Sequence, residues 1–367
     1  MSLSLPAMNV SARVDRLRGL FDEAEVDALL VTRLPNVAYL TGFTGSAGML
    51  FAARDDAILV TDGRYAQQSE EQITASGADV RIEIATTQAE QRAVLSAAAA
   101  TPHRLGLESE GVTWAQQRTF VEWFPGTELV PTQHLVERLR AVKESGEVAR
   151  IRAACSIADD ALAEVLPTLH GGPTEREFAL SLEWAMRQRG ATRTSFDTIV
   201  AAGPNGAKPH ARPTDRAIEA SELVVIDFGC VVDGYCSDMT RTVSVGDPGD
   251  DARHVWDVVA QSQRAGRDAV RAGVGCADVD RASREVIVDA GWGEAFAHST
   301  GHGVGLEIHE APRVSATADA TLETGHVVTV EPGVYLPGVG GVRIEDTVVV
   351  TPDGADVLTE FPKSLVI

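Results

Sequence analysis

The sequence predicts an α/β domain over residues 1–140, followed by an α+β domain with an antiparallel sheet over residues 141–367. Two patterns carry this prediction. In the first part, short apolar runs alternate with segments of helical periodicity, which is typical of a layered α/β domain. In the second part, β-branched runs are grouped around helices without alternating strictly with them, which favours antiparallel strands. A chain of 367 residues is long enough for two such cores.

The elements of the first domain are predicted from apolar runs, helical stripes and the turn residues between them. Apolar runs predict strands at 28–32, 48–53, 57–61, 80–85 and 105–108. Helical spacing of apolar residues predicts helices at 65–76, 88–100 and 114–124, and the last of these ends before Pro125-Gly126.

The second domain begins with helices. One is expected over 134–166 with an interruption near Ser145-Gly146, and another over 174–189, where Thr174 and Glu177 have the spacing of a capping box. Strands are expected at 198–201, 223–228, 239–245, 327–330 and 342–350. Two helices, 251–271 and 277–290, lie between the third and fourth of these strands.

The composition is that of a soluble globular protein, with 44% hydrophobic and 23% charged residues. With 32 basic and 53 acidic side chains the net charge is −21, which argues against nucleic acid and anionic membranes as partners. No apolar run approaches the roughly 20 residues of a membrane span, and residues 1–16 lack the apolar core of a secretory signal.

The cysteine content favours a reducing, cytoplasmic location. Four cysteines in a chain of this length are too few for a disulfide framework. Cys230 and Cys236 are close in sequence, but no second pair at zinc-finger spacing accompanies them. We therefore expect all four to be reduced packing residues.

Two aspartates mark the start of a chemical constellation. Asp227 follows the apolar residues 223–226, and Asp238 opens the next strand, with the turn signal Asp233-Gly234 between them. A hairpin would bring both carboxylates together, and a cation between them would relieve their repulsion. The alternative is that Asp238 forms a surface ion pair with Arg241.

Further ionisable groups follow near the C-terminus. His302 has a glycine on either side, which permits a close backbone approach that a merely packed histidine does not need. Glu331 ends an apolar strand before Pro-Gly. In the strand at 342–350, the period of two puts Arg343 and Glu345 on one face and Asp346 on the other.

These residues resemble a known family. The ordered set Asp227, Asp238, His302, Glu331 and Glu345 resembles the five metal ligands of the pita-bread metallopeptidases, which include methionine aminopeptidase, Xaa-Pro aminopeptidase and Xaa-Pro dipeptidase (prolidase). The motifs that carry the resemblance are PHARP at 209–213, VIDFGCVVDGYCSDMTRT at 225–242, HSTGHGVGLEIHEAP at 298–312, TVEPGVY at 329–335 and GVRIEDT at 341–347. In the first domain, LPNVAYLTGFTGSAG at 34–48 and TDGRY at 61–65 resemble the creatinase-like N-terminal domain of the Xaa-Pro branch.

The resemblance implies a pita-bread (creatinase/aminopeptidase-like) catalytic domain that holds two divalent ions. Asp238 and Glu345 would bridge both ions, Asp227 would bind one, and His302 and Glu331 the other. Hard oxygen ligands favour Mn²⁺, with Co²⁺ or Zn²⁺ able to substitute. A water that bridges two cations becomes a hydroxide nucleophile near neutral pH, and Glu331 would accept and relay its proton.

Four other residues take roles by similarity. His210 would stabilise the scissile carbonyl as it gains charge, and His309 would contact the substrate on the proline side. His298 would line the same pocket, and Arg343 would orient a site carboxylate. For His298 and Arg343, a supporting structural role is an equal alternative to direct substrate contact.

The segment GPNGAKPHARP matches the Xaa-Pro branch, so the expected substrate is a peptide with proline in second position. An Xaa-Pro aminopeptidase is favoured by TDGRY and TGFTGSAG, and an Xaa-Pro dipeptidase restricted to dipeptides is the alternative. A creatinase-like amidinohydrolase and a non-catalytic peptide-binding module are remote alternatives, because both lose metal ligands and none is missing here. Analogy with the family also predicts a homodimer or higher homo-oligomer.

Overall fold

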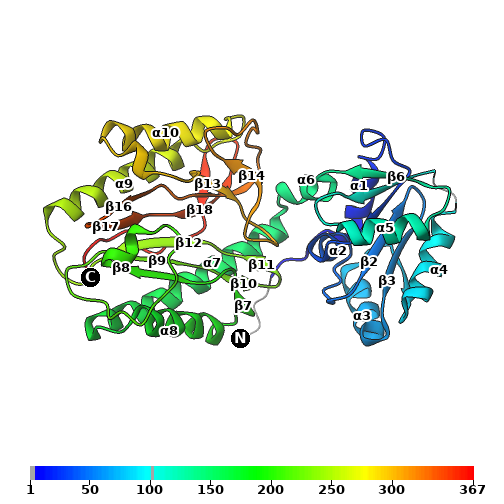
Figure 1. The fold of residues 1–367 in the computed structure, drawn as a ribbon, viewed down its shortest axis with the longest axis horizontal. Helices are drawn as coiled ribbons and strands as arrows, with labels where there is room; N and C mark the ends of the chain where they lie inside the picture. Colours follow the sequence, from blue (N-terminus) through cyan, green and yellow to red (C-terminus); the bar gives the residue numbers. More distant parts are fainter. Residues whose placement is uncertain (1–4, 101–102) are drawn as a thin grey trace. The chain divides into compact units, whose positions relative to one another are not determined.

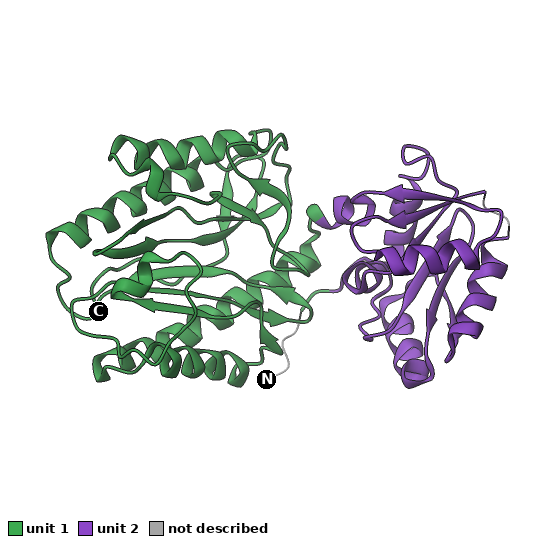
Figure 2. Ribbon diagram, viewed as in Figure 1, with its two compact units in different colours: residues 1–6, 141–367 green, residues 7–140 purple. Residues whose placement is uncertain are grey.

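A computed structural model describes residues 5–100 and 103–367. The described chain forms two compact units, residues 7–140 and residues 141–367 together with residues 5–6 (Figure 2). Residues 1–4, the start of the segment in which we expect no secretory signal, lie outside the described residues. Among the described residues, no helix is both long enough and apolar enough to cross a membrane.

The N-terminal unit is built on one mixed six-stranded sheet in the order β4-β3-β2-β1-β5-β6 (Figure 1). The three central pairings, β3 with β2, β2 with β1 and β1 with β5, are antiparallel, antiparallel and parallel. The strands are β1 (Ala28–Val31), β2 (Met49–Ala53), β3 (Ala57–Thr61), β4 (Arg81–Ile84), β5 (Arg104–Glu108) and β6 (Glu128–Thr132). The helices are α1 (Arg13–Arg18), α2 (Leu34–Thr41), α3 (Ala66–Ser76), α4 (Gln88–Ala98), α5 (Trp114–Trp123) and α6 (Leu135–Ala141).

Helices α1 and α2 and strand β6 of this unit were not predicted. Helix α2 is a short apolar segment. Its ends do carry the usual helix-boundary signals, which are Pro35 in the first turn and Gly42 at the C-cap with a φ of 80°. Strand β6 contains Pro131 and lies at the edge of the sheet, the position where proline is tolerated in a strand.

In the second unit, two pairs of helices enclose several small sheets (Figure 1). Helices α7 and α8 pack on one side against a core that includes Phe228 and Met239, and α9 and α10 pack against the other sheets. The helices are α7 (Ser145–Val165), α8 (Glu175–Gln188), α9 (Asp250–Ala269) and α10 (Cys276–Asp289). The strands are β7 (Arg193–Thr194), β8 (Ile199–Ala202), β9 (Val224–Phe228), β10 (Cys230–Val232), β11 (Tyr235–Cys236), β12 (Met239–Val243), β13 (Gly301–Gly303), β14 (Glu310–Val314), β15 (Val327–Val330), β16 (Gly333–Leu336), β17 (Gly340–Arg343), β18 (Asp346–Val350) and β19 (Ala355–Val357).

The structure confirms two predicted helix boundaries in the second unit. The interruption near Ser145 separates α6 from α7, and the Thr174–Glu177 capping box is formed at the start of α8. The prediction of one strand over 342–350 is wrong. Strand β17 ends at Arg343 and a separate strand, β18, begins at Asp346. Strand β17 pairs with β16, while β18 pairs with β15 and β19.

All four cysteines are buried and free. Their burial raises the pKa of the Cys230 thiol to about 12, which keeps it protonated and unreactive at neutral pH.

Candidate active site

The first two carboxylates come from adjacent antiparallel strands. Strand β9 pairs with β12 so that Asp227 lies opposite Thr240, and Asp238 is the residue before β12. The Asp233-Gly234 turn is present, with φ values of 48° and 87°, but it joins β10 to β11 in a separate small sheet. The pairing of β9 with β12 therefore brings the two aspartates to one cavity.

The alternative of a surface ion pair between Asp238 and Arg241 is wrong. Arg241 is 2% exposed, and its Nη2 atom donates to Asp346 Oδ1 at 3.1 Å. On β12 the Thr240 hydroxyl donates to Glu345 in the site, so its neighbour Arg241 points to the opposite face of the strand.

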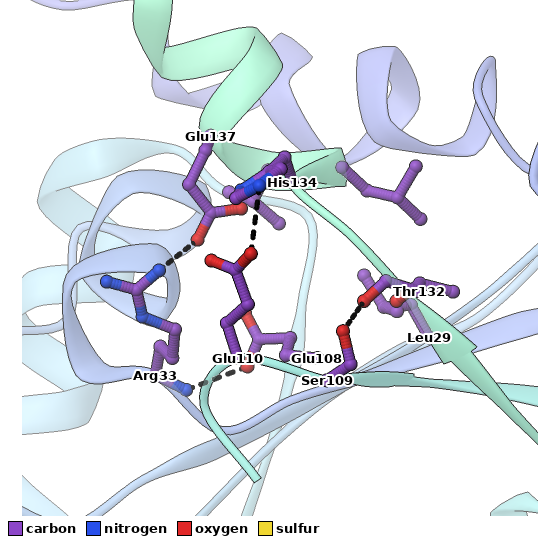
Figure 3. Close-up of a pocket in the computed structure, with 10 residues that line it drawn as sticks. Leu29, Arg33, Glu108, Ser109, Glu110, Thr132, His134 and Glu137 are labelled. Atoms are coloured by element: carbon purple, nitrogen blue, oxygen red, sulfur yellow. Dashed lines mark hydrogen bonds and ion pairs between the residues drawn. The ribbon is translucent and has the colours of Figure 1, made fainter. Parts of the chain in front are cut away.

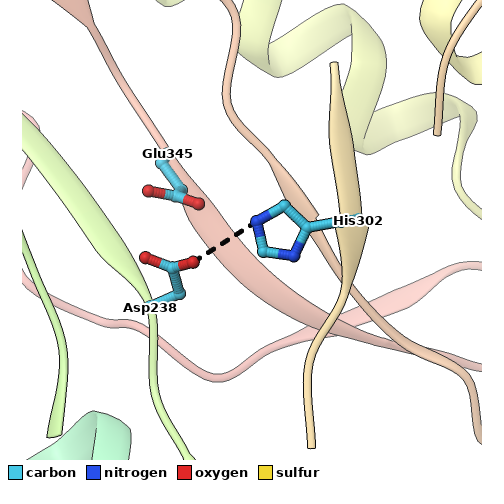
Figure 4. Close-up of side chains that lie close together, drawn as sticks. All are labelled: Asp238, His302 and Glu345. Atoms are coloured by element: carbon cyan, nitrogen blue, oxygen red, sulfur yellow. Dashed lines mark ion pairs between the residues drawn. The ribbon is translucent and has the colours of Figure 1, made fainter. Parts of the chain in front are cut away.

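Three ligand-type side chains converge in the cavity (Figure 4). One ligand atom from each of Asp238, His302 and Glu345 lies within 4.8 Å of the other two. His302 Nε2 is 3.5 Å from Asp238 Oδ2 and 3.4 Å from Glu331 Oε1. Glu331 and Asp227 line the same cavity without belonging to the three-residue group.

The glycines beside His302 serve the packing of its strand. A Cβ on Gly301 would lie 2.0 Å from the carbonyl oxygen of Thr329, and one on Gly303 would lie 2.2 Å from that of Ala311. Only glycine fits there, because β13 runs between β14 and β15 at short distance. The close approach predicted from the sequence therefore involves neighbouring backbone.

Arg343 links several of the predicted site residues. Its Nη2 atom donates to Asp227 Oδ2 at 2.6 Å, and its Nη1 atom donates to the Tyr335 hydroxyl at 2.6 Å. The same hydroxyl is 3.0 Å from Nε2 of His298. Tyr335 was not singled out from the sequence, although it ends the TVEPGVY motif, and it joins the two residues whose supporting role was left open.

The electrostatics of the cavity disfavour charged carboxylates. Burial raises the pKa values of Asp238 and Glu345 well above their ordinary values, and the negative charges of neighbouring carboxylates raise them further. Burial also raises the pKa of Glu331 to about 8 and lowers that of His302 to about 4. If Asp238, Glu331 and Glu345 were all ionised, the site would therefore hold more negative charge than its own hydrogen bonds can stabilise.

These groups fit divalent cations. In the part of the chain that the structure describes, Asp227 Oδ1 and Glu345 Oε1 are buried and have no hydrogen-bond partner. A buried carboxylate oxygen without a donor is costly unless a cation binds it. Four carboxylates and one imidazole form an oxygen-rich set suited to hard divalent ions.

The cavity around these groups has a volume of about 800 Å³. His210, His298 and His309 are in its wall, and the ring of His309 packs edge-on against His302 with centroids 4.3 Å apart. Two arginines in the wall, Arg212 and Arg313, were not predicted from the sequence. Residue type alone could not distinguish them from the many exposed arginines of the chain.

The fold and site define a metal-dependent hydrolase with an accessory N-terminal domain, and comparison with known proteins identifies the family. The chain belongs to metallopeptidase family M24, whose model matches residues 149–352, and the Creatinase/Prolidase N-terminal domain model matches residues 13–142. The family and the pita-bread fold predicted from the sequence are thereby confirmed, and the chain is a hydrolase of this family.

Relatives share the whole architecture. An uncharacterised peptidase of Bacillus subtilis is 40% identical, over 97% of this chain and 99% of its own. A solved Xaa-Pro dipeptidase from Bacillus anthracis is 39% identical with a TM-score of 0.93, over 98% of this chain and 100% of its own. An X-Pro aminopeptidase from Thermotoga maritima is 35% identical with a TM-score of 0.88, over 97% and 100%.

Proposed function

We propose that this chain hydrolyses the peptide bond between an N-terminal residue and a following proline. The observation that carries the proposal is the buried group of Asp238, His302 and Glu345, flanked by Glu331 and Asp227, in the wall of a cavity large enough for a peptide. Solved relatives that span the whole chain bear the names Xaa-Pro dipeptidase and X-Pro aminopeptidase.

The proposed cofactor is a pair of divalent ions held by Asp227, Asp238, His302, Glu331 and Glu345. Mn²⁺ is the preferred ion because carboxylate oxygens are hard ligands, and Co²⁺ or Zn²⁺ can substitute. Two such ions would supply an activated water and polarise the scissile carbonyl.

The chain's own side chains complete the proposed chemistry. The carboxylate of Glu331 accepts a proton from the attacking water, and the Thr329 hydroxyl, 3.4 Å from Glu331 Oε1, supports that carboxylate. His210 donates to the carbonyl oxygen as it gains negative charge. His309 contacts the substrate on the proline side, and Arg343 holds Asp227 in one orientation.

The volume of the cavity favours an aminopeptidase. About 800 Å³ lies in the upper part of the range of roughly 300–1,000 Å³ found for small-molecule sites, so residues beyond proline can be accommodated. A second candidate is a strict dipeptidase, because Arg212 and Arg313 in the cavity wall are suited to bind the free carboxylate of a dipeptide.

A substrate panel tests both candidates. Manganese-loaded protein is given a series of Xaa-Pro dipeptides and the matching Xaa-Pro-Yaa tripeptides, with Xaa-Ala peptides as controls. Cleavage of the tripeptides before proline supports the aminopeptidase, and cleavage of dipeptides alone supports the dipeptidase. An Arg313→Gln variant sharpens the result, since loss of a carboxylate contact raises KM for dipeptides more than for tripeptides. Absence of cleavage of every proline peptide would contradict the proposed function.

A further inference from the structure

His210 lies on a loop whose two ends meet at one buried carboxylate. The loop leaves β8 at Ala202, forms the short 3₁₀ helix Gly203–Ala207 and continues through His210 to Thr214. Glu175, the first residue of α8, has an exposed fraction of 0% and contacts both ends of the loop.

Both oxygen atoms of the Glu175 carboxylate accept hydrogen bonds from the loop. Its Oε1 atom accepts hydrogen bonds from the backbone N–H of Ala202 at 2.8 Å and from Asn205 Nδ2 at 3.1 Å. Its Oε2 atom accepts from the backbone N–H of Thr214 at 2.9 Å, from the Thr214 hydroxyl at 2.6 Å and from Asn205 Nδ2 at 3.0 Å. Hydrogen bonds in a buried position are electrostatically stronger than the same bonds in water.

The middle of the loop contacts strand β17. The carbonyl oxygen of Pro209, the residue before His210, accepts from Arg343 Nη1 at 3.2 Å. A Cβ on Gly341 would lie 1.9 Å from the carbonyl oxygen of Gly206, so this part of the loop packs directly on β17. Strand β17 therefore contacts the middle of the loop, while Glu175 binds its two ends.

We propose that Glu175 is a positioning residue for His210, and that its carboxylate closes the loop and thereby holds the imidazole at the reacting carbonyl. This inference rests on the proposed function of His210. Capping of α8 does not account for the contacts of Glu175, because Thr174 and Glu177 form the capping box. Glu175 and Glu177 therefore lie two residues apart on one helix and serve different partners.

Hydrogen exchange tests the closure of the loop without reference to activity. Glu175→Gln places an amide N–H₂ against several donors, so the amides of Ala202 and Thr214 should exchange at least about tenfold faster. The matched control is Glu177→Gln, which weakens the cap of the same helix and should leave exchange of the 202–214 segment unchanged. Unchanged protection of that segment in Glu175→Gln overturns the proposal.

Kinetics test the link to His210. Glu175→Gln should lower kcat about tenfold to a hundredfold, with a smaller change in KM and unchanged metal content, because a small displacement of a reacting group has costs of that order. In a His210→Ala background the same substitution should have little further effect on kcat. Full multiplication of the two losses would contradict a shared action.

A second variant and the exchange measurement test the role of Glu175 even if Glu175→Gln does not fold or no peptide is cleaved. If Glu175→Gln does not fold, Thr214→Val, which removes one hydroxyl donor, is judged by the same exchange and kinetic criteria. If the wild-type protein cleaves no proline peptide, the proposed function fails, while the exchange comparison still decides whether Glu175 closes the loop.

Discussion

Two buried carboxylates, one in each unit, have opposite surroundings. Glu108 of the N-terminal unit is 8% exposed, and its Oε2 atom accepts a hydrogen bond from the backbone N–H group of Thr32 at 2.6 Å. The same oxygen accepts from the backbone N–H group of Arg33 at 2.9 Å (Figure 3). Its Oε1 atom accepts from Asn36 Nδ2 at 2.7 Å. Glu108 thus accepts hydrogen bonds from the backbone of the two residues that precede α2 and from a side chain in the first turn of that helix.

Glu345 in the catalytic domain is 1% exposed, but it has far fewer donors. The Thr240 hydroxyl donates to its Oε2 atom, while Oε1 is a buried atom without a partner in the described chain. Burial raises the pKa of both carboxyls. Hydrogen bonds oppose that rise for Glu108, whereas the charges of Glu331 and Asp227 add to it for Glu345. Burial alone therefore does not identify a metal ligand, and the neighbours of the carboxylate do.

The largest expected effect is the loss of the metal site. Asp238→Ala should reduce activity to background with little change in circular dichroism, because the side chain faces a cavity and fills no core. In the wild type, a chelator should have the same effect and Mn²⁺ should restore activity best. The metal-free variant should melt at a higher temperature than the metal-free wild type, since one of the repelling carboxylates is gone. Full activity of protein shown to be metal-free would refute the metal requirement.

The two kinds of histidine in the cavity give the next largest effects. His302→Ala should lower metal content and activity together, with partial recovery at high metal concentration. His210→Ala should retain the metal while kcat falls by about 10² to 10³, the usual cost of removing a donor to a developing oxyanion. Metal analysis beside steady-state kinetics separates them, and a metal-depleted His210→Ala protein would overturn this division.

Glu108→Ala tests the buried carboxylate that is stabilised by hydrogen bonds and not by a metal. Loss of the carboxylate leaves buried N–H groups unsatisfied, which should lower the free energy of unfolding by about 1–3 kcal/mol in urea titrations. Saturating Mn²⁺ should stabilise this variant as much as the wild type, in contrast to Asp238→Ala. The control is Glu110→Ala, which removes an exposed ion pair with His134 and should cost about 0–1 kcal/mol.

The smallest expected effect is a pH dependence of the metal-free protein. Because the pKa of Glu331 is raised to about 8, the folded state binds more protons than the unfolded state between pH 4.5 and 8. Stability should therefore fall as pH rises, by on the order of 1 kcal/mol per pH unit. Burial lowers the pKa of His302 to about 4, which opposes this trend below pH 6.5, so the window from 6.5 to 8 is the informative one. Thermal melts of the metal-free Glu331→Gln variant should show a smaller slope there.

Much of the architecture was predictable because its causes are local. The capping box of Thr174 and Glu177 acts within one turn of helix, and the apolar runs that became β1, β3, β9 and β15 are short strands whose burial is evident in their composition. The proposed ligand set has a different basis, since its five residues occur in ordered motifs that resemble a family, and as a set of metal ligands it stays a prediction. Helix α2 and strand β6 were missed because their sequences have weak propensity and tertiary packing decides their conformation.

What the sequence by itself determined was the fold class of the two parts of the chain and many of the ionisable groups that line the cavity. Only the tertiary structure decided their partners, because folding brings together side chains as far apart in the sequence as Arg241 and Asp346. Arg241 pairs with Asp346 and leaves Asp238 to the cavity, and Tyr335 joins Arg343 to His298. Glu175 is indistinguishable in the sequence from any acidic residue in a first helical turn. Its function follows from the two loop ends that the fold brings to it, since a carboxylate acquires its role from the donors and charges around it.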